Sequence, residues 1–171
     1  VVMLHHLVGD ALPQGSLEAD LEFYLPRTAH GSSLSPAIHA SVLARAGRPD
    51  EALELLRLAL HIDLADQTGT TADGLHLATM GGAWQAIVFG FLGLAVEDGP
   101  QLRVDPVLPD DWHRLRVRLQ VLGRRVEVGA GHDEVTLTAT SALTWTWPGA
   151  PEPVSAEALR LVGGHHRWRQ G

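Results

Sequence analysis

The spacing of apolar residues changes near residue 100, and this change limits the chain to a helical part followed by a sheet part. In segment 53–60 apolar residues recur every three or four positions, which is the period of an amphipathic helix. In segment 115–121 they alternate with polar residues, which is typical of a strand with one face toward a core. We therefore predict a helical domain over 1–99, an antiparallel β domain over 100–148 and a disordered tail over 149–171.

The helical part contains recognisable helix starts. Ser35 is a favourable N-cap, and Pro36 suits the first helical position because its missing N–H is not needed there. Asp73 is expected to cap a long glycine-rich helix that reaches about Leu94. That helix is apolar on nearly every face, so we expect it to be buried on all sides, with close packing at glycines such as Gly81. The other expected helical segments are the tail of a helix that stops at 9–10, a turn at 17–23, and a helix from 49 that precedes a polar loop at 66–73.

Composition excludes several classes of protein. With 13 basic and 20 acidic residues the net charge is −7, which argues against binding of duplex nucleic acid. There are no cysteines, so disulfides, thiolate catalysis and cysteine-ligated zinc are excluded. The longest apolar run, 83–96, is too short to span a bilayer, and the default expectation is a cytoplasmic protein. The pairs His5-His6 and His165-His166 match no metal-ligand spacing, so no metal site is predicted.

Two helix starts have the composition of an anion site. Residues 30–36, HGSSLSP, place a glycine and free hydroxyls directly before a helix, whose N-terminus carries about half a positive charge. The alternative is a plain capping loop, in which Ser33 or Ser35 only satisfies helix N–H groups. His76 falls in the first turn of the glycine-rich helix, where a neutral ring could donate an N–H to an anion. The alternative there is a buried histidine bonded to a carbonyl. Together the two starts favour a phosphate site.

Other catalytic signals are missing from the sequence. The acidic residues of the helical part, Asp63 among them, lie in no apolar or aromatic setting that would raise a carboxyl pKa for general acid catalysis. No G-x-S-x-G nucleophile elbow and no GxxxxGK[ST] phosphate loop occurs.

Five motifs together resemble glycoside hydrolase family 65, which comprises the maltose, trehalose and kojibiose phosphorylases and their relatives. Segment 24–35, YLPRTAHGSSLS, looks like the "Y-x-P-R-T-x-H-G-S-S-L-S" stretch of that family. The resemblance covers about residues 1–140. The remaining motifs are DGLH at 73–76, GGAW at 81–84, Gly90-Phe91, and LPDDW at 108–112, which is similar to the entry to the small C-terminal β domain of the family.

The resemblance implies the last helices of an (α/α)₆ barrel followed by a small antiparallel β-sandwich. It also implies an inverting phosphorolysis, in which inorganic phosphate attacks the anomeric carbon of an α-glucoside and β-glucose 1-phosphate leaves with a free sugar. By motif position Ser32, Ser33 and His76 would bind phosphate. His30, Gly31 and Gly74 would support them. No cofactor is expected, and the partners are an α-glucoside and phosphate, with a homodimer of the intact protein possible by the same resemblance.

The general acid of the family lies upstream of the segment that this chain resembles. We therefore expect the chain to be a C-terminal piece of a longer protein, to hold no catalytic residue, to be inactive alone, and to expose an apolar stripe. Two other functions stay open. One is a hydrolase of the same family that acts on α-glucosides such as trehalose, and the other is a non-catalytic carbohydrate-binding or structural module.

Overall fold

The computed structural model describes residues 1–13, 15–97 and 99–171, and it divides them into two compact units. The first unit, Val1–Gly90, is helical, and the second, Phe91–Gly171, contains the sheet. The helices-then-sheet order predicted from the change of period is confirmed. The first unit ends nine residues before the predicted limit at 99.

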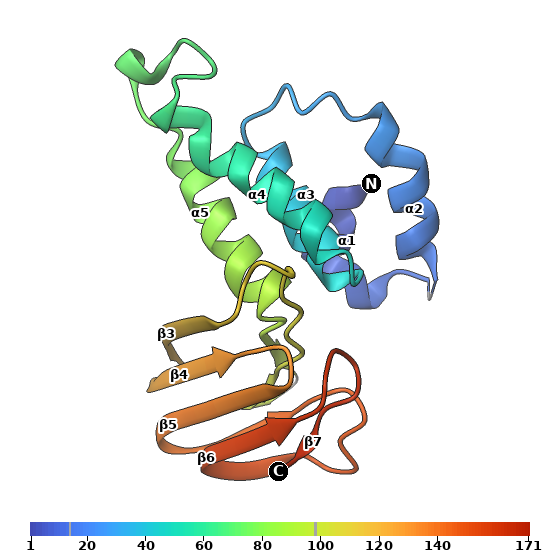
Figure 1. The fold of residues 1–171 in the computed structure, drawn as a ribbon, viewed down its shortest axis with the longest axis vertical. Helices are drawn as coiled ribbons and strands as arrows, with labels where there is room; N and C mark the ends of the chain where they lie inside the picture. The colour runs from blue at the N-terminus through green and yellow to red at the C-terminus, as the bar shows by residue number, and fades with distance from the viewer. Residues whose placement is uncertain (14, 98) are drawn as a thin grey trace. The chain divides into compact units, whose positions relative to one another are not determined.

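Helix α3 is the centre of the first unit and packs against α1, α4 and α5 (Figure 1). Eight of its eleven residues are buried, among them Ala37, Ala40 and Ala44, so neighbouring helices approach its backbone closely. Its N-cap is Leu34 and Ser35 is the first helical residue, so the helix begins one position earlier than predicted. The helices are α1 (Val2–Val8), α2 (Ser16–Tyr24), α3 (Ser35–Arg45), α4 (Pro49–Leu64) and α5 (Leu77–Gln85), with short 3₁₀ turns at Gly9–Ala11, Leu25–Arg27 and Thr71–Asp73.

Helix α4 begins and packs as its sequence predicts. Pro49 stands at the start, and Asp50 and Glu51 in the first turn complement the positive end of the helix dipole. The buried residues recur at helical spacing on one face, which contacts α3 and α5. They are Ala52, Leu53, Leu56, Ala59 and Ile62.

The glycine-rich segment differs from the single long helix that we expected. Asp73 ends a 3₁₀ turn and does not cap α5, which starts at Leu77 and continues after Gln85 as a π-helix over Ala86–Phe91. Burial on all sides is also wrong for this chain, because Leu77 is 73% exposed and Trp84 50% exposed. The expected exposed apolar stripe is present on α5 and on α1, where Leu7 is 66% exposed.

Close backbone packing of this segment occurs at Gly82 and Gly90. A Cβ at Gly90 would lie 2.8 Å from the Cα of Ser41, and one at Gly82 would lie 3.0 Å from the Cβ of Ala37. The expectation for Gly81 is wrong, because no heavy atom lies within 4 Å of its Cβ position. The glycines on the α3 side of the segment are therefore the ones that packing requires.

Replacing Gly90 with alanine is expected to cost about 2 kcal/mol of stability, because the new methyl group meets the α3 backbone, which cannot rotate away. Replacing Gly81 with alanine is the matched control and should be neutral or stabilising by up to about 1 kcal/mol, since alanine is the better helix former. Denaturant unfolding of both variants measures the difference. Equal stabilities would contradict the assigned packing.

The second unit is built on one connected mixed sheet with strand order β1-β2-β5-β4-β3, and with β6 paired to β5 and β7 to β6. Strands β3 to β6 are antiparallel neighbours and lie side by side in Figure 1. The predicted antiparallel order fails at one place, because β2 runs parallel to β5. The strands are β1 (Ala95–Glu97), β2 (Gln101–Arg103), β3 (Leu115–Val121), β4 (Arg124–Ala130), β5 (Glu134–Thr146), β6 (Val154–Val162) and β7 (Arg169–Gln170).

Strand β5 joins two parts of the sheet. Its first half pairs with β4, its last residues, 144–146, pair with β2, and β6 follows it along the other edge across a bulge between Thr138 and Leu143. Trp145 lies at the centre of the core, fully buried, and its indole Nε1 donates to the carbonyl oxygen of Ala156 at 3.2 Å. The core of this unit therefore includes a contact between β5 and β6.

The predicted disordered tail at 149–171 is wrong. Residues 154–162 form β6, and 169–170 form β7. Leu159, Leu161 and Trp168 of this segment are buried. The segment is therefore a structural part of the sheet, and its order comes from pairing with β5.

Candidate functional site

The loop before α3 places Ser32 and Ser33 where the sequence predicts, at the start of a helix. Ser32 is exposed and Ser33 is half-buried. The backbone N–H of Leu34 donates to Ser32 Oγ at 3.4 Å, so Ser32 also forms a local turn bond, in line with the alternative of a capping loop. Gly31 is exposed beside them.

His30 and His39 support this loop from within. His30 Nδ1 lies 2.9 Å from Ser35 Oγ, and the two imidazole rings meet edge to face with centroids 4.9 Å apart. His39 Nδ1 also lies 2.8 Å from the carbonyl oxygen of Ser35. Burial lowers the pKa of both histidines, so both rings are neutral at pH 7. The predicted supporting role of His30 has a physical basis in its contacts with Ser35 and His39.

His76 is held by Asp63. The structure places it as the N-cap of α5 and not in the first turn, because a 3₁₀ turn and Gly74, at φ +150°, precede it. Asp63 Oδ1 lies 2.6 Å from His76 Nδ1, and Asp63 Oδ2 accepts the backbone N–H of His76 at 2.8 Å. The hydrogen bond from His76 lowers the pKa of Asp63, whose side chain is 5% exposed, so the carboxylate is charged at neutral pH.

The Asp63 contact decides which ring nitrogen of His76 can serve a ligand. With Nδ1 engaged by the carboxylate, Nε2 is the nitrogen left for an incoming group. A neutral ring of this tautomer accepts a hydrogen bond at Nε2, and a protonated ring donates one. In this tautomer a neutral ring does not supply the N–H donor that we predicted for an anion, and phosphate would instead donate its own P–OH to Nε2.

Thr79 joins the two predicted halves of the site. Its hydroxyl donates to the carbonyl oxygen of Ser33 at 3.0 Å, and its backbone N–H donates to the carbonyl oxygen of His76 at 2.9 Å. Thr79 is fully buried. The main chain of Ser33 thus lies against the first turn of α5, next to the residue that carries the predicted imidazole. That Ser32, Ser33 and His76 bind one phosphate stays a prediction.

Asp63 and Thr79 are site residues that the sequence analysis did not assign. Asp63 lies in the last turn of α4, thirteen residues before His76, and no spacing rule connects these positions. Thr79 is a small polar residue inside an apolar segment, which is the signal in the sequence that could have marked it, and the structure shows that it is fully buried.

A pocket of about 270 Å³ lies beside the serine loop. Ser32, Ser35 and His39 contribute polar groups to it, and the remaining lining comes from residues 1–3, from Tyr24, Thr28 and Leu34, and from Ile38 of α3. Ser33 and His76 are not among its lining residues. The pocket therefore includes one of the three predicted phosphate residues.

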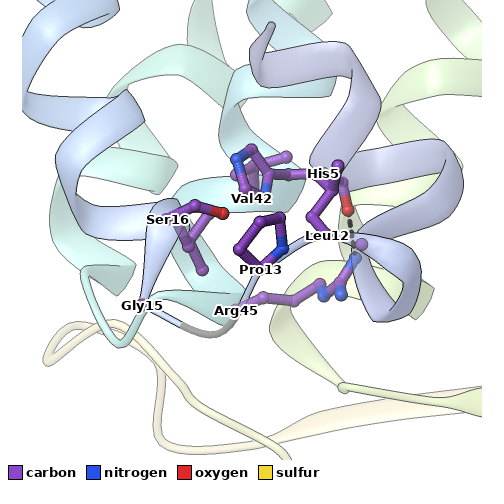
Figure 2. Close-up of a pocket in the computed structure, with 9 residues that line it drawn as sticks. His5, Leu12, Pro13, Gly15, Ser16, Val42 and Arg45 are labelled. Carbon is purple, nitrogen blue, oxygen red and sulfur yellow. Dashed lines mark hydrogen bonds between the residues drawn. The ribbon is translucent and has the colours of Figure 1, made fainter.

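A second pocket, of about 160 Å³, lies between α1, α2 and α3 (Figure 2). The guanidinium of Arg45 donates to the carbonyl oxygen of His5 at 3.1 Å, which the dashed line in Figure 2 marks, and His5 Nε2 lies 2.8 Å from Asp20 Oδ2. Gly9 keeps the space beside Arg45 open, since a Cβ there would lie 3.1 Å from the guanidinium. These bonds connect α3 to α1 and α1 to α2, so we interpret the pocket as a structural junction.

Two family profiles match the chain. Residues 1–85 match "Glycosyl hydrolase family 65 central catalytic domain", and residues 95–149 match "Glycosyl hydrolase family 65, C-terminal domain". The division between the two matches falls near the limit between the helical unit and the sheet unit.

Three similar proteins are named as phosphorylases. The chain is 38% identical over 138 residues to kojibiose phosphorylase of Halothermothrix orenii, covering 81% of this chain and 18% of the relative. It is 32% identical over 163 residues to kojibiose phosphorylase of Escherichia coli strain K12, covering 95% and 22%. It is 37% identical over 127 residues to α,α-trehalose phosphorylase of Geobacillus stearothermophilus, covering 74% and 16%.

A solved structure assigned to a kojibiose phosphorylase from the human microbiome is similar in fold, with a TM-score of 0.85 and 25% identity. The similarity covers 97% of this chain and 24% of that one. The chain thus spans between about a sixth and a quarter of the length of these proteins. Within the described residues, no helix is both long and apolar enough to cross a membrane.

Proposed function

Because the chain belongs to glycoside hydrolase family 65, we propose that it is part of an inverting glycoside phosphorylase and supplies residues that bind phosphate. The substrate class is an α-glucosidic disaccharide, and the products are β-glucose 1-phosphate and a free sugar. Kojibiose and trehalose are the sugars named for the relatives. No cofactor takes part in this reaction, and phosphate is the second substrate.

One observation supports the phosphate site above the others. Thr79 links the loop of Ser32 and Ser33 to the helix start that carries His76, and Asp63 orients the His76 ring. Hydroxyls, backbone N–H groups at a helix start and an oriented imidazole are groups that bind a phosphate oxyanion. The described polar groups of this cluster include no arginine or lysine, so in the intact protein a basic residue from another segment would complete the charge balance.

In the proposed reaction these residues hold phosphate while one of its oxygens attacks the anomeric carbon. The bond between that carbon and the leaving oxygen breaks, and a carboxylic acid from another part of the barrel gives its proton to the leaving sugar. Attack from the opposite face inverts the configuration. These residues would raise the rate mainly by holding the phosphate oxygen close to the anomeric carbon, because a nucleophile that is held in place has a high effective concentration.

The exposed apolar residues of α1 and α5 fit a role within a larger helical barrel. Leu7 and Leu77, both more than 60% exposed, would be covered if further helices pack against these faces. We propose that the (α/α)₆ barrel is completed by segments of the intact protein outside this chain, and that the 171 residues alone are inactive.

The test is phosphate dependence of the intact protein. With kojibiose, trehalose and maltose as substrates, cleavage should require phosphate and should yield glucose 1-phosphate in the β configuration, measured by NMR. Cleavage in phosphate-free buffer would instead establish a hydrolase. Absence of cleavage under both conditions, with sugar binding retained, would establish a non-catalytic module.

Replacing Ser33 with alanine should raise the KM for phosphate about tenfold, the loss expected for one hydrogen bond to a charged group. The KM for the disaccharide should change little, because the hydroxyl is assigned to phosphate. Ser155→Ala, at an exposed position of β6, is the matched control. An unchanged phosphate KM in the Ser33 variant would leave Ser33 in a capping role only.

A further inference from the structure

A second cluster of ligand-type side chains lies entirely within the sheet unit and belongs to no part of the proposed phosphate site. Asp105 follows β2, and His165 and His166 lie between β6 and β7. His166 Nδ1 is 2.6 Å from Asp105 Oδ2, and His165 Nδ1 is 3.2 Å from Asp105 Oδ1. One suitable atom from each residue lies within 4.8 Å of the other two.

The carboxylate of Asp105 is fixed in position by other donors. Its side chain is 5% exposed, and Oδ1 accepts the backbone N–H of His166 at 3.1 Å and the indole N–H of Trp168 at 3.2 Å. Trp168 is itself buried. A ligand that is held by bonds of this kind keeps its orientation when a metal ion binds, as the outer-shell partners of known metal sites do.

The imidazole ring of His165 is not fully satisfied by hydrogen bonds. Both of its ring nitrogens are buried. Nδ1 lies 3.2 Å from Asp105 Oδ1, within ion-pair range, and within the described residues Nε2 has no hydrogen-bond partner. A buried polar atom without a partner costs free energy and calls for an explanation. The ring also packs against that of His166, with centroids 3.6 Å apart, so the two Nδ1 atoms approach the same carboxylate from adjacent residues.

We propose that Asp105, His165 and His166 form a binding site for a divalent first-row transition metal ion of the Zn²⁺ type. Two imidazole nitrogens and one carboxylate oxygen are ligands that such ions prefer over Mg²⁺ or Ca²⁺. Ligand atoms around a tetrahedral zinc ion at the usual bond lengths are about 3.4 Å apart, so the shorter contact between His166 and Asp105, 2.6 Å, would open by about 0.8 Å around an ion. His166 is 61% exposed, which leaves an open side for a water molecule as the fourth ligand.

A metal ion at this site would stabilise the sheet unit. Asp105 comes shortly after β2, and the two histidines stand some sixty positions later in the chain, between the last two strands. An ion bound here would connect the two ends of the sheet unit. Metal binding should therefore raise the thermal stability of this unit.

The experiment uses the intact protein without a histidine tag, stripped of metal and titrated with Zn²⁺ by calorimetry and with Co²⁺ by visible absorption. We expect one ion per chain, a visible d–d spectrum of a low-symmetry Co²⁺ site, and a higher Tm with Zn²⁺. His166→Ala should weaken binding by more than about tenfold. This variant keeps the backbone N–H of residue 166 and the Trp168 bond on Asp105, so the fold is preserved and is checked by circular dichroism.

His132→Ala is the matched control, since His132 is an exposed histidine of the same unit outside the cluster. Binding that is unchanged by His132→Ala and lost with His166→Ala or His165→Ala supports the site. No stoichiometric binding, a Co²⁺ spectrum identical in wild type and His166→Ala, or a Tm insensitive to Zn²⁺ would each overturn it. None of these outcomes depends on phosphorolysis, so the phosphate site and the metal site fail separately.

Discussion

Replacing Gly93 with alanine is expected to destabilise the protein by about 3 kcal/mol or more. Gly93 has φ +60°, a conformation in which an alanine side chain is strained. Its Cβ position lies 2.2 Å from the carbonyl oxygen of Asp105 and 2.7 Å from the carbonyl carbon. Because both are backbone atoms of a segment that is buried, the clash cannot be relieved by a side-chain rotation.

The control for this prediction is Gly123→Ala in the turn between β3 and β4. Gly123 has φ +73°, and no heavy atom lies within 4 Å of its Cβ position. It therefore reports the backbone strain alone, about 1 kcal/mol. Chemical denaturation of the two variants separates strain from the clash, and similar losses at both positions would mean that the Asp105 backbone moves aside.

Replacing His76 with alanine should lower kcat/KM for phosphate about 100-fold in the intact protein, while the KM for the disaccharide changes little. The variant removes the imidazole that we propose as a phosphate ligand and leaves Asp63 as a charged carboxylate near the proposed phosphate position, where it would repel the anion. Steady-state kinetics with each substrate varied in turn give the two values.

The variant Asp63→Asn tests how His76 is held. We expect a smaller rise in phosphate KM, about tenfold, because asparagine can still accept one hydrogen bond but no longer fixes the ring as a carboxylate does. His61→Ala, an exposed histidine of the same helix that contacts the Arg57 carbonyl, is the matched control. Equal losses of phosphate and disaccharide binding in both His76 and Asp63 variants would indicate a structural role only.

The helices that the sequence predicts well are those in which local signals and tertiary packing agree. Helix α4 has a proline and acidic residues at its start and a single apolar stripe, and the structure uses all of these features. The glycine-rich segment is the opposite case. Its change to a π-helix after Gln85, and the choice of Gly82 and Gly90 over Gly81 as packing positions, depend on where α3 lies.

The C-terminal strand β6 shows why pattern alone fails for some strands. Its buried residues are only Leu159 and Leu161, and its apolar residues shift from even positions (Val154, Ala156, Ala158) to odd ones, so no single alternation runs along the strand. The strand forms because β5 offers an unpaired edge along its whole length, which is a tertiary effect.

Short sequence motifs identify Ser32, Ser33 and His76 as candidate site residues, but they do not identify the residues that these three contact. Asp63 and Thr79 reach them through the packing of α4 and α5, and Asp105 meets His165 and His166 across some sixty positions. A pairing over such a separation has no periodic signature in a single sequence.

The pairings of strand β5 with β2, β4 and β6 also bear on the order in which the sheet unit folds. Its pairings with β4 and β6 link neighbours in the chain, so these hairpins close over short loops and can form early. The parallel pairing with β2 joins Gln101 to Thr144 and must wait until the residues between them have folded, since the closing entropy of that loop is larger. We expect β1 and β2, the link to the helical unit, to gain protection from hydrogen exchange last during refolding.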